Sequence, residues 1–249
     1  MISEPFSQGQ SLLHRMDARI KILSMGLCLT SVSAVQGHAA ALSALLFGAG
    51  LVFIARLQIS SVLLRLAPAN IFFLVLGLVL GLTYPGESLD YFSRLSHDGL
   101  SLALRIFLKG NALLLIFMAL ACTSSVPVLA QALQGLGLPR KLTLLLAFTF
   151  RQIFLVIEEF QRLHRTVLAR GFHPRCTLHT YQTYAVLFGQ TLIRSLARAE
   201  RIHSAMLLRG FSGHFRPLFA PPWNRADVYP ALGLCVPPLL ISLHDRWPW

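Results

Sequence analysis

Ala169-Arg170-Gly171-Phe172 and Leu208-Arg209-Gly210-Phe211 are two copies of one short phrase in a chain of 249 residues. Each copy ends a basic segment with helical periodicity, and a proline follows within a few residues, at positions 174 and 217. Glycine just beyond the last helical turn stops a helix by adopting the left-handed conformation, and arginine in that turn complements the helix dipole. The two phrases therefore predict where two long helices end.

The segments that lead to these phrases are amphipathic. The first begins near residue 136, starts apolar and becomes charged, and Leu155, Glu159 and Arg162 recur in it at helical spacing. The second is predicted to be helical over residues 178–209, where arginines interleave with apolar residues. The pattern predicts a basic hairpin of two long helices within residues 136–212.

The composition is that of an integral membrane protein. Hydrophobic residues make up 55% of the chain and charged residues only 13%, against about a quarter in soluble domains, and the mean hydropathy is +0.62. The net charge of +12 does not indicate a nucleic-acid binder, because the basic residues stand between apolar stretches too long for a soluble domain. Four cysteines without a C-x-x-C spacing do not form a disulfide framework, and no cleavable signal peptide is evident.

The apolar segments predict about five membrane spans, at residues 22–35, 39–55, 68–82, 102–126 and 229–243. The Ala- and Gly-rich second segment favours close helix packing. Pro68 is expected at the start of the third segment, prolines interrupt the last one, and Trp247 and Trp249 are expected at the interface. Arg105 and Lys109 are expected to snorkel, although facing a protein partner is the alternative.

Charge sets the expected orientation. A basic cluster at residues 14–21 precedes the first span and predicts a cytoplasmic N-terminus, while the acidic connection at 84–98 fits the outer side. Five crossings then place the C-terminus outside. The predicted organisation is all-α, in three parts. Residues 1–135 hold the N-terminal segment and spans one to four, residues 136–226 the cytoplasmic coupling region with its proline-containing connection at 211–227, and residues 227–249 the last span.

No catalytic constellation is visible. Phosphate-binding Gly-rich loops, H-E-x-x-H and G-x-S-x-G motifs and carboxylates within the spans do not occur in the sequence. His173, Cys176 and His179 could mimic a metal site, but Pro174 breaks their common face and a fourth ligand is not evident. The candidates for a membrane-bound enzyme, Glu158, Glu159 and His164, are better interpreted as solvated helix faces or subunit contacts. We therefore expect a chain with no enzymatic activity, metal ligand or cofactor.

The arginines of the two phrases leave two interpretations open. Arg170 and Arg209 are either parts of ordinary helix caps or tips that bind carboxylates through bidentate hydrogen bonds, which lysine cannot match. The neighbouring Phe172 and Phe211 could then fill apolar pockets of the partner. Two such tips would suit a dimeric partner with two equivalent acidic grooves.

Several further stretches resemble one family. Residues 13–21 read Leu-His-Arg-Met-Asp-Ala-Arg-Ile-Lys, with Ala18 where the family usually has Pro, and residues 133–139 read Leu-Gln-Gly-Leu-Gly-Leu-Pro. Arg151 is followed by Glu158-Glu159, and Ala205-Met206 precedes the second phrase, in which Leu208 replaces the family's Ala. The set resembles the transmembrane T component of energy-coupling-factor (ECF) transporters, of the cobalt-transporting CbiQ type.

The resemblance implies a function. Members of the family lie in the bacterial inner membrane and join two ABC ATPase subunits, which bind ATP and Mg, to a substrate-binding CbiM-like subunit, with or without a small CbiN-like subunit. The resemblance implies ATPase-coupling motifs at Ala169, Arg170, Gly171 and at Leu208, Arg209, Gly210, supported by Phe172 and Phe211. We expect cobalt import linked to cobalamin biosynthesis; alternatives are nickel or vitamin import, or a stand-alone channel or carrier.

Overall fold

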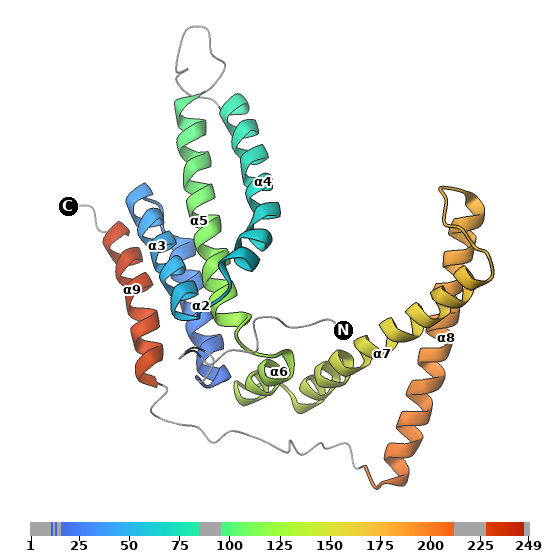
Figure 1. The fold of residues 1–249 in the computed structure, drawn as a ribbon. Helices are drawn as coiled ribbons and strands as arrows, with labels where there is room; N and C mark the ends of the chain where they lie inside the picture. Colours follow the sequence, from blue (N-terminus) through green and yellow to red (C-terminus); the bar gives the residue numbers. More distant parts are fainter. Residues whose placement is uncertain (1–10, 12, 14–15, 85–95, 212–227, 247–249) are drawn as a thin grey trace. The chain divides into compact units, whose positions relative to one another are not determined.

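The computed structural model describes residues 11, 13, 16–84, 96–211 and 228–246, and every element in them is an α-helix (Figure 1). This confirms the all-α class. The helices are α2 (Ala18–Ala34), α3 (His38–Ile54), α4 (Ile59–Thr83), α5 (His97–Ala121), α6 (Val126–Gly135), α7 (Arg140–Ala169), α8 (Leu178–Leu208) and α9 (Val228–Arg246).

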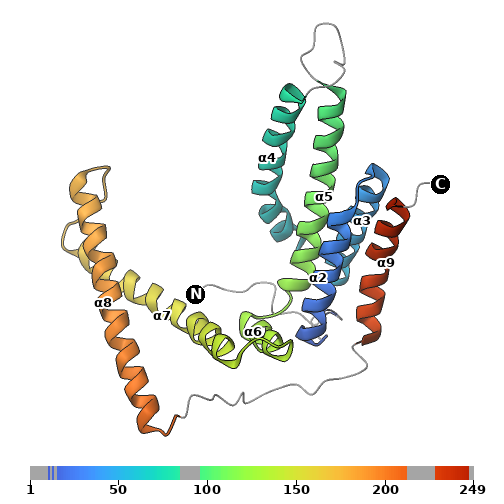
Figure 2. The same ribbon diagram turned by 180° about the vertical axis from the view of Figure 1, so that it is seen from behind.

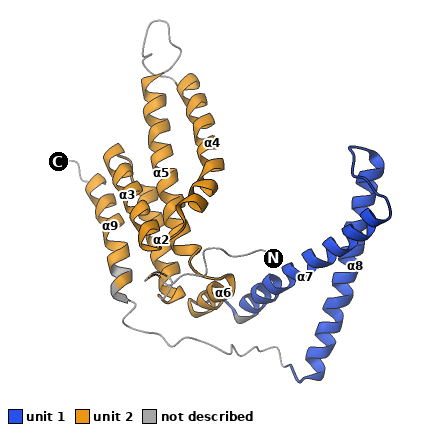
Figure 3. Cartoon of the chain, in the orientation of Figure 1, with its two compact units in different colours: residues 1–3, 137–220 blue, residues 4–136, 221–249 orange. Residues whose placement is uncertain are grey.

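The chain divides into two compact units (Figure 3). Unit 1 comprises residues 1–3 and 137–220 and contains α7 and α8. Unit 2 comprises residues 4–136 and 221–249 and contains α2 to α6 together with α9. The last helix, α9, thus belongs to the same unit as α2 to α6.

The core of unit 2 lies among α2, α3, α5 and α9, which run side by side in both views (Figures 1 and 2). Its fully buried positions are mostly small or β-branched, and they include Cys28, Val32, Ala44, Ala112 and Ile116. A Cβ atom added to Gly48 of α3 would lie 3.1 Å from the Leu115 Cβ and 3.2 Å from the Ala112 carbonyl oxygen of α5. The prediction that small residues bring the second segment close to a neighbouring helix is confirmed.

Among the described helices of unit 2, α4 exposes the most large apolar side chains. In the part of the chain that the structure describes, α4 and α5 are long and apolar enough to cross a membrane, and α3 is apolar but only 17 residues long. Most of α4 is exposed, including Leu64 (76%) and Leu74 (70%). An apolar helix with so little cover inside its own chain is suited to a lipid or protein environment. The number of five spans remains a prediction.

The third and fourth apolar segments differ from the prediction at their N-terminal ends. Helix α4 begins at Ile59, so Pro68 lies inside the helix instead of at its start. Helix α5 begins at His97, where the Ser96 side chain caps it by accepting a hydrogen bond from the Gly99 N–H at 3.0 Å. The fourth segment also ends earlier than predicted, at Ala121, and a separate short helix, α6, follows with Pro127 in its first turn.

Helix α9 is continuous through Pro237 and Pro238, so the predicted interruption by prolines is wrong for these two. Asp245 near its C-terminus accepts a hydrogen bond from the Gly37 N–H at 2.9 Å, in the turn between α2 and α3. The Cys28 thiol of α2 donates to the Leu234 carbonyl oxygen at 3.4 Å. These contacts place α9 parallel to α2. The predicted interfacial residues Trp247 and Trp249, and most of the connections at 84–98 and 211–227, lie outside the described residues.

Lys109 of α5 is bound within its own unit, and the prediction that it snorkels stays a prediction. Its ammonium group donates hydrogen bonds to the carbonyl oxygens of Ser33 and Val35, the latter at 3.1 Å. It therefore satisfies acceptors at the C-terminal end of α2, where the helix dipole also favours a cation. Arg105, one turn earlier on α5, lies close enough to Asp245 of α9 for their charges to interact. Both cations thus serve contacts within unit 2.

Candidate functional site

Both long helices end where the repeated phrase predicts. Helix α7 ends at Ala169 and α8 at Leu208, so Arg170 and Arg209 are the two C-cap residues. Gly171 and Gly210 follow with φ angles of 83° and 75°, in the left-handed region that favours glycine. The prediction of two glycine-stopped helices is confirmed.

The two helix ends share one hydrogen-bond pattern. The Phe172 N–H donates to the Val167 carbonyl oxygen at 3.3 Å, and the Gly171 N–H donates to that of Leu168 at 3.0 Å. At the second end, the Phe211 N–H donates to Met206 and the Gly210 N–H to Leu207, both at 3.0 Å. Each pair of bonds forms a Schellman motif, with the phenylalanine at C″ and the glycine at C′. The repeated phrase thus gives both helices the same C-terminal backbone conformation, with an arginine at the C-cap of each.

The two arginines lie at opposite ends of α8. Arg209 caps its C-terminus, whereas Arg170 lies near its N-terminus, because Phe172 packs edge-to-face on Tyr184 of α8 with ring centroids 6.0 Å apart. With 31 residues in α8, the two tips are about 46 Å apart at 1.5 Å per residue. Both side chains are exposed, and neither forms an ion pair with a carboxylate of the described residues. The structure therefore presents two separate, free guanidinium groups.

Replacing Gly210 by alanine is expected to destabilise the end of α8. No atom lies within 4 Å of an added Cβ, so the cost is the left-handed conformation itself, about 1 kcal/mol. Thermal unfolding followed by circular dichroism measures the effect. Gly189, also in α8 and also with open space around its Cβ position, is the matched control. Gly189→Ala is expected to stabilise the folded chain by up to about 1 kcal/mol. An equal effect of both changes would contradict the expected cost of the left-handed conformation at position 210.

Aromatic rings hold α7 against α8 near the first tip. Phe160 stacks on Phe188 with centroids 5.0 Å apart, and His164 stacks on Tyr184 at 5.8 Å. The His164 Nε2 and the Tyr184 hydroxyl also lie at hydrogen-bond distance, 3.3 Å. Stacked aromatic pairs contribute about 0.5–1.5 kcal/mol beyond their buried area. Phe172 belongs to this cluster, so its ring stabilises the hairpin of α7 and α8 within the chain itself.

Glu159 of α7 forms the main polar contact between the two helices. It is 8% exposed, and Arg194 and Arg198 of α8 donate hydrogen bonds to its two carboxylate oxygens at 2.7 and 3.3 Å. Arg162, one turn along α7, approaches the same carboxylate at 4.0 Å and also pairs with Glu158 at 3.5 Å. Since Arg194 and Arg198 are four residues apart, they lie on one face of α8 and grip one carboxylate.

The hydrogen bond from Arg194 holds the pKa of Glu159 below its ordinary value, and the charges of Arg162, Arg194 and Arg198 add to this against the opposing effect of burial. A carboxylate with a lowered pKa stabilises the folded state above its unfolded pKa and loses this contribution as the pH falls through its folded pKa.

The contribution of Glu159 to hairpin stability is therefore expected at neutral pH and lost progressively below about pH 4.3, the ordinary pKa of glutamate. Thermal unfolding of the wild-type chain and the Glu159→Gln variant should differ at pH 7, and the difference should shrink toward pH 3. A difference that stays constant over this range would contradict the ionised contact.

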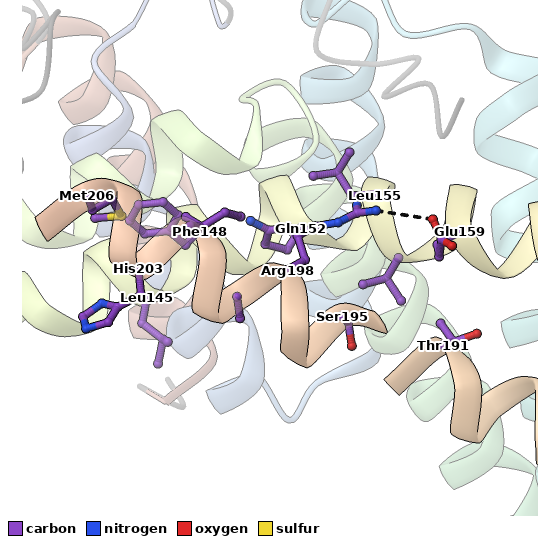
Figure 4. A pocket seen from close by; sticks show the side chains of 13 residues that line it. Leu145, Phe148, Gln152, Leu155, Glu159, Thr191, Ser195, Arg198, His203 and Met206 are labelled. Atoms are coloured by element: carbon purple, nitrogen blue, oxygen red, sulfur yellow. Dashed lines mark hydrogen bonds and ion pairs between the residues drawn. The ribbon is translucent and has the colours of Figure 1, made fainter. Parts of the chain in front are cut away.

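Toward the start of α7 and the end of α8 the two helices diverge (Figures 1 and 2), and a cavity of about 530 Å³ lies between them (Figure 4). Its walls are mainly apolar and come from both helices, with Glu159 and Thr191 at one end and Arg198 along the wall. The lining residues include Leu145, Phe148, Leu155, Ile202, His203 and Met206. The hairpin is thus tightly packed at its aromatic end and hollow toward the start of α7 and the end of α8.

The interpretation of Glu159 as part of a solvated helix face is wrong, since this side chain is buried against α8. His164 is half-buried and contacts Tyr184 of α8, and a role of either residue in subunit contacts stays a prediction. Glu158 does lie exposed, as expected for a solvated face (67% of its side chain). The sequence did contain a signal for the burial of Glu159. Glu159 lies one turn after Leu155 on the same face of α7, and arginines four residues apart stand at positions 194 and 198 on the next helix.

The region of the candidate metal ligands holds no metal-like cluster. His173 and Cys176 are exposed, and His179 lies near the ring of Phe172. Within the described parts of the chain, no group of three or more His, Cys, Asp or Glu residues could hold a metal ion. The described residues give no reason to assign a metal site to this loop.

The basic run before the first span binds the link between α5 and α6 within unit 2. Asp17 caps α2 by accepting a hydrogen bond from the Arg19 N–H at 3.0 Å. The ammonium group of Lys21, which is 2% exposed, donates to the Ser124 hydroxyl at 2.8 Å. The Arg19 guanidinium lies directly against Gly135, at the end of α6. Two stretches that carry the family resemblance therefore meet in the structure.

Comparison with known proteins agrees with this arrangement. The family model described as cobalt transport protein, CbiQ, matches residues 9–219. The energy-coupling factor transporter transmembrane protein EcfT of Acidaminococcus fermentans is 25% identical over 220 residues, which cover 82% of this chain and 81% of that protein. The match to the family model includes both glycine-stopped helices and the N-terminal basic run. The chain therefore belongs to the CbiQ family, the transmembrane components of energy-coupling-factor transporters.

Proposed function

We propose that this chain couples the movement of two ABC ATPase subunits to a separate substrate-binding membrane subunit in a cobalt importer. The observation that carries the proposal is the pair of identical helix ends, each presenting an exposed arginine. Two equal tips suit two equal grooves, as a pair of identical or homologous ATPases would offer. Arginine suits carboxylates in such grooves because its planar fork forms two parallel hydrogen bonds.

The proposed role of the chain is mechanical and non-catalytic. ATP and Mg would bind to the partner ATPases, and the cargo to a CbiM-like subunit, with or without a CbiN-like one. Cobalt is preferred to nickel or a vitamin because the matching family model is described by cobalt transport. In this proposal the chain lies in the bacterial cell membrane, and the basic run at residues 14–21 keeps its N-terminus in the cytoplasm.

The proposal also assigns sides to the ends of the helices. Helices α2 and α9 are parallel, so both would run from the cytoplasm outward. Five spans, α2 to α5 and α9, would then leave the C-terminus outside. The arginine-tipped helices α7 and α8 would lie on the cytoplasmic side, where ATP is available.

Reconstitution into proteoliposomes tests this function. The chain, an ABC ATPase pair and a CbiM-like subunit are assembled, and uptake of radiolabelled Co²⁺ is measured with ATP and with a non-hydrolysable analogue. ATP-dependent uptake that needs this chain is expected, with excess Ni²⁺ as the competitor that tests cargo choice. Uptake by this chain alone, without ATPases, would contradict coupling and indicate a channel or carrier.

A further inference from the structure

The contact between Glu159, Arg194 and Arg198, which we call the pivot contact, has a position that suggests a mechanical role. We propose that Glu159 is a positioning residue that sets the crossing angle of α7 and α8, and that this contact is the pivot about which the two arginine-tipped helices turn. The mechanical consequence rests on the proposed coupling function, but the structural claim concerns this chain alone.

The first argument is the place of the contact within the hairpin. On one side of it lie the stacked rings, with Phe160 next in sequence to Glu159 and its ring 5.0 Å from that of Phe188. On the other side the helices diverge (Figures 1 and 2), and the cavity of about 530 Å³ lies between them (Figure 4). Glu159 itself lines one end of that cavity. The pivot contact thus marks the boundary between the packed and the open part of the hairpin.

The second argument is that, apart from the ring contacts near the first tip, little else fixes the angle between the helices. In the described part of unit 1 the buried residues are few: Thr143, Glu159, Thr180, Leu187 and Thr191. Leu187 is the one large apolar side chain among them, whereas Leu145, Leu192 and Leu196 are more than 60% exposed. A closely packed core would resist rotation, because packed interiors deform little. An almost coreless hairpin leaves its angle to a few directional contacts.

The third argument is the chemistry of the pivot contact. Two arginines from α8 each bond a different oxygen of one carboxylate, so the bonds fix both position and orientation. The arginine side chains are 50% and 32% exposed, so water can replace part of the contact during movement. A partly solvated ion pair contributes only modest stability, but its hydrogen bonds still favour one geometry. These properties suit a contact that rearranges during movement better than one that locks the two helices.

The tips lie at useful distances from the pivot contact. Eleven residues separate Glu159 from Arg170 and fifteen separate Arg194 from Arg209, which corresponds to arms of about 16 and 22 Å. A rotation of about 10° would carry the end of the longer arm through about 4 Å. A small change in crossing angle therefore becomes a displacement that two closing ATPases could impose.

Spin-label distance measurements on the full chain in lipid nanodiscs test the structural claim. Labels at Thr149→Cys on α7 and Ser204→Cys on α8 report the opening across the cavity, since both positions are exposed. Cys122 and Cys176 are replaced by serine to avoid extra labels, while Cys28 and Cys235 are buried. Glu158→Gln is the matched control, because Glu158 pairs only with Arg162 of its own helix among the contacts described.

Glu159→Gln is expected to shift the mean distance between the labels and to increase the width of the distance distribution about twofold. Loss of this one contact frees the crossing angle without unfolding the helices. Glu158→Gln is expected to leave the distribution unchanged. Circular dichroism checks that helix content is kept. The charge-reversed variant E159R/R194E/R198E, which restores opposite charges, is expected to recover the narrow distribution. Equal distributions for Glu159→Gln and Glu158→Gln, or no recovery in the triple variant, would overturn the proposal.

A transport readout separates this proposal from the coupling function. In the reconstituted complex, Glu159→Gln is expected to lower Co²⁺ transported per ATP hydrolysed by about fivefold or more, while co-purification with the ATPases persists. If the wild-type complex shows no ATP-driven uptake, the coupling function fails, yet the distance measurement still decides the pivot. If coupling works but Glu159→Gln transports as efficiently as the wild type, the pivot role is wrong.

Discussion

Exchange of both Arg170 and Arg209 for glutamate is expected to abolish assembly of the chain with an ABC ATPase pair. Both side chains are exposed and unpaired with carboxylates of the described residues, so the change does not remove a contact that holds the fold. If each arginine bonds a carboxylate in a partner groove, its loss costs about 2–5 kcal/mol, or at least about thirtyfold in affinity. Glutamate adds repulsion, and two distant tips should add their effects.

Single variants and a lysine series sharpen this prediction. R170E and R209E alone should each weaken co-purification, and neither should abolish it if the two grooves are equivalent. Arg→Lys at both tips should fall between wild type and the glutamate variant, because lysine keeps the charge but loses the bidentate bond. Co-purification and ATP-driven Co²⁺ uptake measure the outcome in parallel.

The matched control for the double variant is R165E/R201E. Arg165 and Arg201 lie on the same two helices, are exposed, and change the net charge by the same amount. Assembly should survive this change if the tips recognise the partner. Equal loss in R165E/R201E and R170E/R209E would show that general positive charge attracts the ATPases, and the tip-specific interpretation would then be wrong.

The helix ends of unit 1 could be predicted because their signal is local. Arg-Gly-Phe supplies a C-cap, a residue tolerant of positive φ and a C″ side chain, so the end of α7 and that of α8 follow from four residues each. The start of α5 was also encoded locally, by Ser96 as an N-cap and Asp98 in the first turn. The apolar stretch that begins later in the sequence predicts a start near residue 102 instead.

Pro68 and Lys109 show what sequence alone does not reveal. The start of α4 at Ile59 depends on the helix continuing through a proline, which membrane helices tolerate when their neighbours compensate for the lost hydrogen bond. Lys109 could not be assigned to α2 from its own helix, because its acceptors lie 74 and 76 residues earlier in the chain. Such long-range polar contacts depend on which helices pack together.

The pivot contact was hidden for a related reason. Helical phase placed Glu159 between the polar and apolar faces of α7, and such residues are usually solvated. Its burial follows from the antiparallel return of α8, which brings Arg194 and Arg198 across a separation of 35 and 39 residues. The hairpin itself was predicted from sequence, but the register between its two helices was not.

Gly48→Leu is expected to destabilise unit 2 strongly. The Cβ position at Gly48 is 3.1 Å from the Leu115 Cβ and 3.2 Å from the Ala112 backbone oxygen, so a larger side chain must push α3 away from α5. Overpacking of a well-filled core costs about 1–3 kcal/mol, and a clash with backbone belongs at the upper end of this range or beyond it. Gly50→Leu on the same helix is the control, because nothing lies within 4 Å of its Cβ position and the residue is exposed.

Unfolding of the purified chain in denaturant should show a large loss of stability for Gly48→Leu and little change for Gly50→Leu. Since α7 and α8 belong to the other unit, the aromatic contacts of the hairpin should persist in both variants, and similar stability of the two would contradict the close approach of α3 and α5.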